Sequence, residues 1–370
     1  MSLNQTPAAV EPPRPTGGVD WAKDDHAVAV VAPDGEQTHR FSITHDAAGL
    51  RSRYGSAGNK DDRFDAYVLA DVVRTDRRRL RPLLVDQPAT TALRQSVRAR
   101  KDLVGHRVAV ANQLRAHLQI VFPGAVGLFA DIDSEISLRF LERFPTPEKA
   151  AWLSPKRWAA WLSSVGYSGR TLPDTLHQRL SAAPAGATGP ADDTTAAVTA
   201  AFVAVLRTLT AQIEALAARI AEQLALHPDA PIFTSLPRSG CVRAARLLAE
   251  IGDARGRFPT ADSLACLAGV APSTRQSGKI EVVSFRWGAD KQLRDAICDF
   301  AGDSRHANPW AADLYQRARS RGHDHPHAVR ILARAWVDII WACWTTHTPY
   351  DPSKHRALQR ILNQDQPAAA

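Results

Sequence analysis

Two acidic residues and a dense run of arginines stand close together within residues 60–83 (KDDRFDAYVLADVVRTDRRRLRPL). Asp62 and Asp65 are three residues apart in a helical pattern, which places both carboxylates on one helix face. Such a pair can share Mg²⁺, which takes oxygen ligands and uses one or two carboxylates plus substrate phosphate. Basic residues able to attract a phosphate backbone follow: Arg74, Arg77, Arg78, Arg79 and Arg81. The alternative is that the acids complement a helix dipole and the arginines are simply solvated.

Composition favours a nucleic acid or another anionic partner. The chain has 370 residues and a net charge of +8, which suggests two or three domains and an anionic surface as ligand. It has no run of 18 apolar residues and no signal peptide, so we expect no membrane span. Its four cysteines lack zinc-binding spacing and are expected to be small buried residues of a reducing compartment, the cytoplasm.

Strand patterns near the N-terminus place a third acid beside the pair. Residues 26–32 and 38–44 alternate like two strands around a turn at residues 33–35, and Asp20 lies on or beside the first strand of this hairpin or meander. An acid on a central strand, joined by acids from a later helix, is the layout of an RNase H-like nuclease core. There, carboxylates gather around two metal ions.

Helices are predicted for the middle of the chain. An apolar stripe predicts a long helix over residues 90–118, and a heptad-like stripe predicts a second over 206–224, so the two could pack as an antiparallel coiled coil. Shorter helices are expected near 134–143 and 155–163, with a flexible loop at 183–195. The tryptophans are expected in the core, and the basic residues of the first helix form either a solvated face or a track for phosphates.

The C-terminal part contains two phosphate-binding candidates. The turn Leu236–Gly240 precedes a helix, and such a turn can offer backbone N–H groups to a phosphate. Further on, a Ser-Gly-Lys loop at residues 277–279 is followed by a strand-like segment, 280–285, and a helix over 290–300. A serine hydroxyl is a weak nucleophile that needs activation, and a Ser-Gly pair taken alone most often marks a turn.

These blocks together resemble the insertion-sequence transposases of the DEDD/serine type, a family of bridge-RNA-guided recombinases. The likeness rests on residues 18–32 and 55–83 and on the serine segment 269–279, in that order. It implies a RuvC-like (RNase H-like) domain, then a C-terminal domain that supplies a serine. By this resemblance Asp20, Asp62 and Asp65 hold Mg²⁺, and Ser277 attacks the scissile phosphate, with Ser273 as a weaker alternative.

The resemblance also implies partners. Arg275 and Lys279 would neutralise the phosphate that the serine attacks. DNA is the expected substrate, and many members use a structured guide RNA and assemble as homo-oligomers. In the phosphate-binding turn the family usually has Leu-Pro-Gly-x-Gly; here Arg238 replaces the first glycine, which weakens a backbone nest but keeps a cation.

One family carboxylate is missing. The family's second acid is a glutamate on a strand between the first aspartate and the aspartate pair, but only 42 residues separate Asp20 from Asp62. That spacing leaves no room for a further crossover unit, which needs about 30 residues. Glu36 lies at a turn, and neither Asp46 nor Asp61 is well placed as a substitute. We therefore expect a three-stranded remnant and little strand-transfer activity.

The predicted fold is α/β plus all-α. Its parts are a tail (1–17), a truncated RNase H-like domain (18–88), a coiled-coil spacer with a helical insert (89–228), a mostly α-helical serine transposase domain (229–350) and a second tail (351–370). Two other functions stay open: a catalytically dead nucleic-acid-binding relic, which the missing glutamate favours, and a metal-dependent nuclease without a serine step.

Overall fold

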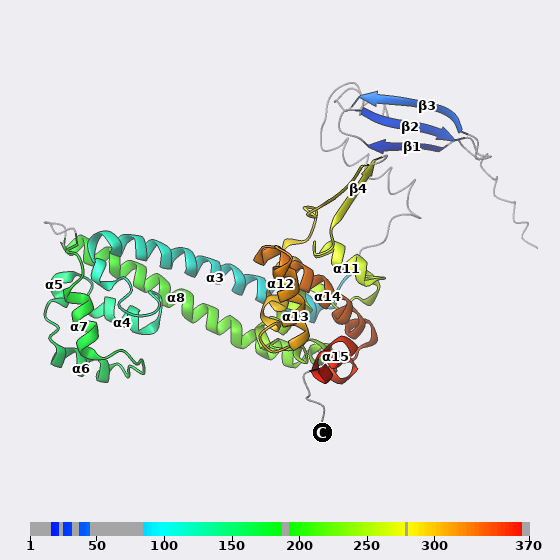
Figure 1. Ribbon diagram of the computed structural model, residues 1–370. Helices are drawn as coiled ribbons and strands as arrows, with labels where there is room; N and C mark the ends of the chain where they lie inside the picture. The colour runs from blue at the N-terminus through cyan, green and yellow to red at the C-terminus, as the bar shows by residue number, and fades with distance from the viewer. Residues whose placement is uncertain are drawn as a thin grey trace, which may run out of the picture. The chain divides into compact units, whose positions relative to one another are not determined.

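The computed structural model divides the chain into two units, Met1–Pro82 and Leu83–Ala370 (Figure 1). It describes residues 16–21, 25–31, 37–44, 84–186, 192–277 and 280–364. For the strands of the first unit, and for residues 192, 275–277, 280 and 281, the description is of the backbone alone. Asp62, Asp65 and the arginines at 74–81 lie outside the described residues, so the predictions made for them are not tested.

The first unit contains a three-stranded antiparallel sheet. Its strands are β1 (Thr16–Trp21), β2 (Asp25–Val31) and β3 (Gln37–Thr44), in the order β1-β2-β3. The predicted strands at 26–32 and 38–44 are confirmed as β2 and β3. Asp20 lies on β1 opposite Ala27. The sheet has the three strands expected for a truncated RNase H-like domain. That the sheet is part of an RNase H-like core stays a prediction.

Two long antiparallel helices, α3 (Pro88–Val121) and α8 (Asp192–Ala225), lie side by side in the second unit (Figure 1). They confirm both predicted long helices, although α8 begins well before residue 206 and takes in the last residues of the predicted loop 183–195. Most of the predicted stripe of α3 is buried, including Leu93, Leu114 and Leu118, whereas Val108 is half exposed. Coiled-coil packing between the two helices stays a prediction.

Helix α8 differs from the sequence expectation in its hydropathy. Within Asp193–Ala225 an 18-residue window reaches a mean hydropathy of 1.6, so the helix is long and apolar enough to cross a membrane by those two criteria. The helix nevertheless packs along α3, and Arg207 in its middle pairs with Glu135 and Glu142. Both features are typical of a helix in a water-soluble bundle rather than of a lipid-facing one.

A small helical cap covers one end of the long pair. It comprises the 3₁₀ turn η1 (Pro123–Ala125), α4 (Glu135–Arg143), α5 (Pro147–Ala150), α6 (Pro155–Ser164) and α7 (Pro173–Ser181). The two predicted short helices are confirmed as α4 and α6. Trp158 is fully buried and stacks on Phe140 with ring centroids 5.4 Å apart, as expected for a core tryptophan. Trp152 departs from that expectation: it is half exposed, with the Arg157 guanidinium 4.3 Å from its ring.

The other end of the long pair carries a helical domain with one β-hairpin. Its elements are α9 (Ala230–Thr234), α10 (Cys241–Ile251), η2 (Arg255–Arg257), α11 (Ala261–Leu267), β4 (Ser273–Ser277), β5 (Ile280–Ser284), α12 (Lys291–Ser304), α13 (Pro309–Ser320), α14 (His325–Thr346), η3 (Pro352–Lys354) and α15 (Arg356–Gln364). Trp336 and Trp344 are fully buried in its core. The predicted tail 351–370 is wrong over η3 and α15, because Leu358 of α15 packs into the same core. Cys241 is exposed rather than buried.

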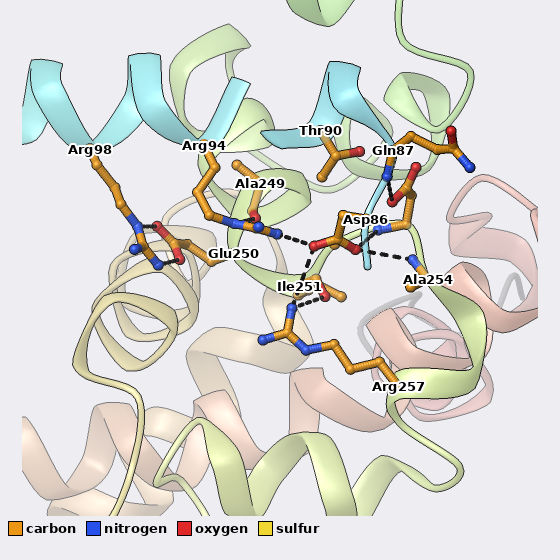
Figure 2. A network of polar contacts seen from close by, with 12 residues as sticks. Asp86, Gln87, Thr90, Arg94, Arg98, Ala249, Glu250, Ile251, Ala254 and Arg257 are labelled. Carbon is orange, nitrogen blue, oxygen red and sulfur yellow. Dashed lines mark hydrogen bonds and ion pairs between the residues drawn. The ribbon is translucent and has the colours of Figure 1, made fainter. Parts of the chain in front are cut away.

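A buried carboxylate fixes the start of α3 to this domain (Figure 2). Asp86, with only 4% of its side chain exposed, accepts hydrogen bonds from the backbone N–H groups of Asp253 and Ala254 at 3.0 and 3.2 Å. It also pairs with Arg94, and Nη1 of Arg257 lies 3.7 Å away. One turn further along α3, Arg98 donates two hydrogen bonds to the buried Glu250 of α10, at 2.9 and 2.6 Å. These ion pairs set the angle between α3 and α10.

Gly252 lets the chain approach this carboxylate. It ends α10 with φ of +86°, a conformation that side chains disfavour. A Cβ atom built at this position would lie 2.3 Å from Oδ1 of Asp86, closer than any van der Waals contact allows. The Gly252 carbonyl also accepts the indole N–H of Trp344 at 2.8 Å. Glycine is therefore required here for both conformation and space.

We predict that Asp86→Asn lowers the free energy of unfolding by about 3–5 kcal/mol, the usual cost of removing one partner from a buried ion pair. Asparagine keeps an acceptor for the two backbone N–H groups and removes only the charge that faces Arg94 and Arg257. Urea denaturation of the full chain measures the change. As a control, Asp313→Asn breaks an exposed pair with Arg317 and should cost less than about 1 kcal/mol.

The same network predicts an acid dependence. Burial alone would raise the pKa of Asp86, but the hydrogen bonds from Arg94 and the Ala254 N–H outweigh it and hold that pKa below its usual value. A depressed folded-state pKa stabilises the fold above the unfolded pKa, about 3.9, and the stabilisation is lost as pH falls through the folded value. The difference between wild type and Asp86→Asn should therefore shrink only below about pH 4. A difference that already disappears near pH 6 would contradict this assignment.

Candidate nucleic-acid interface

The residues predicted to bind metal are only partly described. The backbone of Asp20 lies on β1, one residue before the strand ends, while Asp62 and Asp65 fall outside the described residues. Within the described parts of the chain, no three His, Cys, Asp or Glu side chains come close enough to hold a metal ion. The three-carboxylate site therefore remains a prediction.

The serine segment contributes to a β-hairpin: the predicted strand at 280–285 is confirmed as β5, and residues 273–277, for which no strand was predicted, form β4. Strands β4 and β5 pair antiparallel, with Ser273 opposite Ser284 at the open end and Ser277 opposite Ile280 at the closed end (Figure 1). The pairing is favoured by the β-branched residues Val282 and Val283, which pair with Arg275 and Thr274. Ser277 is thus the last residue of its strand, and Lys279, two residues further along the chain, lies outside the described residues.

Strand geometry separates the two candidate serines. Residues 273, 275 and 277 alternate along β4 and so fall on one face of the ribbon by register. At about 3.3 Å per residue, Ser277 lies about 13 Å from Ser273. The Ser273 carbonyl accepts a hydrogen bond from the Ser284 hydroxyl at 3.3 Å, at the end nearest the helices. Ser277 therefore lies at the closed end of the hairpin, and Ser273 at the end held next to the helices.

Arginines anchor the open end of the hairpin to the helices. Arg286 donates to the carbonyls of Ala271 and Pro272 at 3.4 and 3.1 Å, and so ties the two strands together where they leave the domain. Arg294 of α12 donates to the Arg286 carbonyl at 2.9 Å and also lies over the Phe285 ring, 4.7 Å from its centroid. The hairpin base is consequently fixed from both sides.

The turn before α10 is strained and its cation is already paired. Arg238 has φ of +55°, the left-handed conformation for which the family uses glycine. Its guanidinium bonds to Asp303 at 2.8 Å, and this pairing holds the pKa of Asp303 below its usual value. Arg238 is thus the cation that the sequence indicated, half exposed and paired with an aspartate that Arg243 also contacts, and its role toward phosphate stays a prediction. Ser239, behind it, is buried, and its hydroxyl has no partner among the described residues.

Ion pairs also decide the role of the basic residues on α3. Four of them contact acids of the same unit: Arg94 with Asp86, Arg98 with Glu250, Lys101 with Asp295 and Arg107 with Asp133. A cation that is already paired with an acid gains little free energy from binding a phosphate, since its charge is already compensated. This favours a structural role for most of the α3 charges over the alternative of a phosphate track.

We predict that Arg238→Gly is more stable than Arg238→Ala by roughly 1 kcal/mol. Both variants lose the Asp303 pair, so their difference isolates the left-handed strain of about 1–2 kcal/mol, less the flexibility that glycine adds to the unfolded chain. At the exposed helical residue Arg317 the order should reverse, because glycine in a helix interior costs about 1 kcal/mol relative to alanine. Thermal unfolding of the four variants measures both differences, and the same order at both positions would contradict the strain.

Family comparisons match this chain in two places. A model described as the transposase IS116/IS110/IS902 family matches residues 230–316, which run from α9 through the hairpin into α13. A second model, for DEDD proteins of IS110 and described as a transposase, matches residues 51–123. That second match includes Asp62, Asp65 and the arginines at 74–81, but not Asp20.

Individual proteins match over most of the chain. A protein named as a transposase for the IS117 mini-circle of Streptomyces coelicolor is 30% identical over 93% of this chain and 97% of its own length. A 43.6 kDa protein of the insertion element IS110 from the same organism is 30% identical over 79% and 72% of the two chains. A 42 kDa protein of the insertion element IS900 of Mycobacterium paratuberculosis is 29% identical over 91% and 85%.

Proposed function

Because this chain belongs to the IS116/IS110/IS902 family of transposases, in which DNA transposition is the shared activity, we propose that it cleaves and rejoins DNA strands with metal-binding carboxylates and a serine nucleophile. The observation that carries the proposal is the presence of both family blocks in one chain, with Ser277 at the closed end of a hairpin within the second block.

We propose the same domain division as the sequence suggested, with one change, at the end of the serine domain. Residues 18–88 form a truncated RNase H-like domain, residues 89–228 a helical spacer, and the serine domain begins at 229. The spacer includes the whole of α8, and the serine domain extends to Gln364 because α15 shares its core. One family match, 51–123, crosses the proposed boundary at 88/89 and takes in the whole of α3, while the other, 230–316, begins next to the proposed start of the serine domain.

The carboxylates in the proposed site suit a hard divalent cation. Asp20, Asp62 and Asp65 would offer only oxygen ligands, the donor set that Mg²⁺ prefers. Bound there, the ion would supply charge stabilisation at the scissile phosphate. The protein would hold the three carboxylates at fixed positions. Its arginines at 74–81 would attract the DNA backbone to the site.

The serine supplies the covalent step. Its oxygen would form a bond to phosphorus while the bond to one sugar oxygen breaks, so that a phosphoserine–DNA link retains the energy of the broken linkage. Arg275 and Lys279 are proposed to stabilise the negative charge that builds up on the phosphate oxygens. Ser273 is the weaker candidate, because it lies at the end of the hairpin that is held against the helices.

We further propose that transposition by this chain is impaired. The family's glutamate is absent between Asp20 and Asp62, so one ligand of four is missing. In support, the alignment with the IS117 relative runs over 405 positions although it uses only 93% of the 370 residues here, so that relative carries segments that this chain lacks. This short spacing also favours a second candidate function, a nucleic-acid-binding relic without catalysis.

Other partners follow from the family alone. We propose DNA as substrate, a homo-oligomer as the working form, a cytoplasmic location and, as in many members, a structured guide RNA.

The serine assignment predicts a covalent adduct. The substrate is a DNA strand whose scissile linkage has sulfur in place of the leaving oxygen. Because sulfur leaves more easily, its departure needs less help from a metal ion, so slow adduct formation should be measurable even with an incomplete set of carboxylates. Wild type and Ser273→Ala should give a protein–DNA adduct on denaturing gels, whereas Ser277→Ala should give none. The alanine removes one hydroxyl and no charge, so DNA binding should be unchanged. Adducts that persist in Ser277→Ala, or disappear in Ser273→Ala, would overturn the assignment.

DNA binding should depend steeply on salt. If six or more phosphates are neutralised, affinity for a duplex should fall by roughly 10³-fold or more between 50 and 200 mM salt. Replacing the five arginines at 74–81 by glutamine should make this dependence shallower, while glutamine at Arg356 and Arg360 of α15 serves as the control. Fluorescence anisotropy measures both. An affinity that does not change with salt would contradict nucleic-acid binding through the phosphate backbone.

A further inference from the structure

A cavity of about 520 Å³ opens at the base of the hairpin. Its walls are the loop Gly269–Pro272, the end of β5 with Arg286, and the face of α14 that carries His327 and Arg330. The sequence marked the loop only as part of the serine segment 269–279, and the proposed reaction at Ser277 uses none of these residues. The walls come from three separate segments of the domain, so the cavity is a product of the fold.

The cavity is lined by cations that internal acids do not neutralise. Among the described residues, Arg286 and Arg330 have no carboxylate within 4.0 Å. Arg334, on the same wall, differs because it pairs with Asp262 at 2.5 Å and Asp338 at 2.7 Å. Burial and then the nearby His323 and Arg330 hold the pKa of His327 below its usual value, although Asp324 opposes this shift. An anion in the cavity would therefore meet uncompensated positive charge.

The charges are also held in place before any ligand arrives. Arg330 lies over the Phe285 ring, 5.0 Å from its centroid, and Arg286 is oriented by its bonds to Ala271 and Pro272. A guanidinium that is fixed by packing loses less conformational entropy when it binds an anion. This geometry suits a phosphate, which accepts several hydrogen bonds from guanidinium groups.

An exposed aromatic platform adjoins the cavity. Trp287 is 83% exposed and is held edge-on against Phe285, with ring centroids 5.0 Å apart. Its neighbours on β5, Val282 and Val283, are also exposed. A tryptophan beside a cationic cavity matches the pattern by which proteins bind single-stranded nucleic acid, where aromatic rings stack on bases and cations follow the backbone. Bases within an intact duplex are already stacked and could not use this ring.

We propose that the hairpin-base cavity holds one phosphodiester group of a single-stranded nucleic acid, while Trp287 stacks on a neighbouring base. The site goes beyond the proposed function, since it requires no chemistry at Ser277. It lies at the opposite end of the same hairpin, about 13 Å away along the strand. A strand held there would be kept beside the serine, whether that strand is DNA or RNA.

Two substitutions separate the charge from the stacking. Fluorescein-labelled oligo-dT and oligo-U of 20 nucleotides, and a 20-base-pair duplex, are titrated with the full chain at several salt concentrations. Arg330→Gln should weaken single-strand binding about tenfold and make the slope of log affinity against log salt shallower by about 0.7, the value for one phosphate contact on a single strand. Trp287→Ala should weaken binding by about 5- to 100-fold with the slope unchanged, because stacking releases no counterions.

Matched controls keep the test decisive. Arg360→Gln removes an exposed arginine from α15, without an acid partner in the described part of the chain, and should change neither affinity nor slope. Arg330→Lys keeps the charge and should retain the wild-type slope, so it separates charge from any loss of packing on Phe285. Comparing oligo-dT with oligo-U shows which strand is preferred, and Arg330 dependence with either one supports the proposal.

The proposal is overturned if Arg330→Gln and Trp287→Ala bind both single strands like wild type. It is also overturned if Trp287→Ala weakens duplex binding as much as single-strand binding, because stacking would then not explain the loss. A change of slope caused by Arg360→Gln would show that net charge alone is measured. None of these outcomes depends on strand cleavage, so a failure of the proposed function leaves the test intact.

Discussion

The buried carboxylate of Asp86 is the constraint on which the second unit depends. Its charge is compensated by Arg94 from α3 and approached by Arg257 from the turn after α10, while two backbone N–H groups from that turn complete its shell. Only a glycine at position 252 permits this approach. Together with Arg98 and Glu250, the network gives the long helix α3 one fixed direction relative to the domain that carries the hairpin.

Much of this arrangement follows from local patterns. The stripe through Leu114 and Leu118 predicts α3, and the buried Trp336 and Trp344 agree with the expectation that most tryptophans form core. The Asp86 network could not be predicted, because the backbone N–H groups of Asp253 and Ala254 that it binds are more than 160 residues away in sequence and no periodicity marks them. Strand β5 was predicted, but β4 was missed for a related reason: Ser273–Ser277 shows no strand pattern of its own until Ile280–Ser284 is known to pair with it.

The candidate site was predictable only in part. The serine came from a resemblance and not from a physical pattern, and the structure adds that Ser277 stands at the end of a strand whose base is fixed by Arg286. The basic residues of α3 were open to two interpretations until the positions of Glu250 and Asp295 were known. Cations without an acid partner among the described residues instead lie around Arg330 at the base of the hairpin, where no sequence pattern predicted a cavity.

The central claim is a transposase that keeps its serine hairpin but has an incomplete set of carboxylates. Strand joining in Mg²⁺ tests it most directly, with this chain and the IS117 relative assayed side by side on the same DNA ends. Even changes in the outer shell of a metal site cost about 10- to 100-fold, so a missing ligand should leave this chain roughly 100-fold or more below the relative. Equal joining rates for the two proteins would contradict the account.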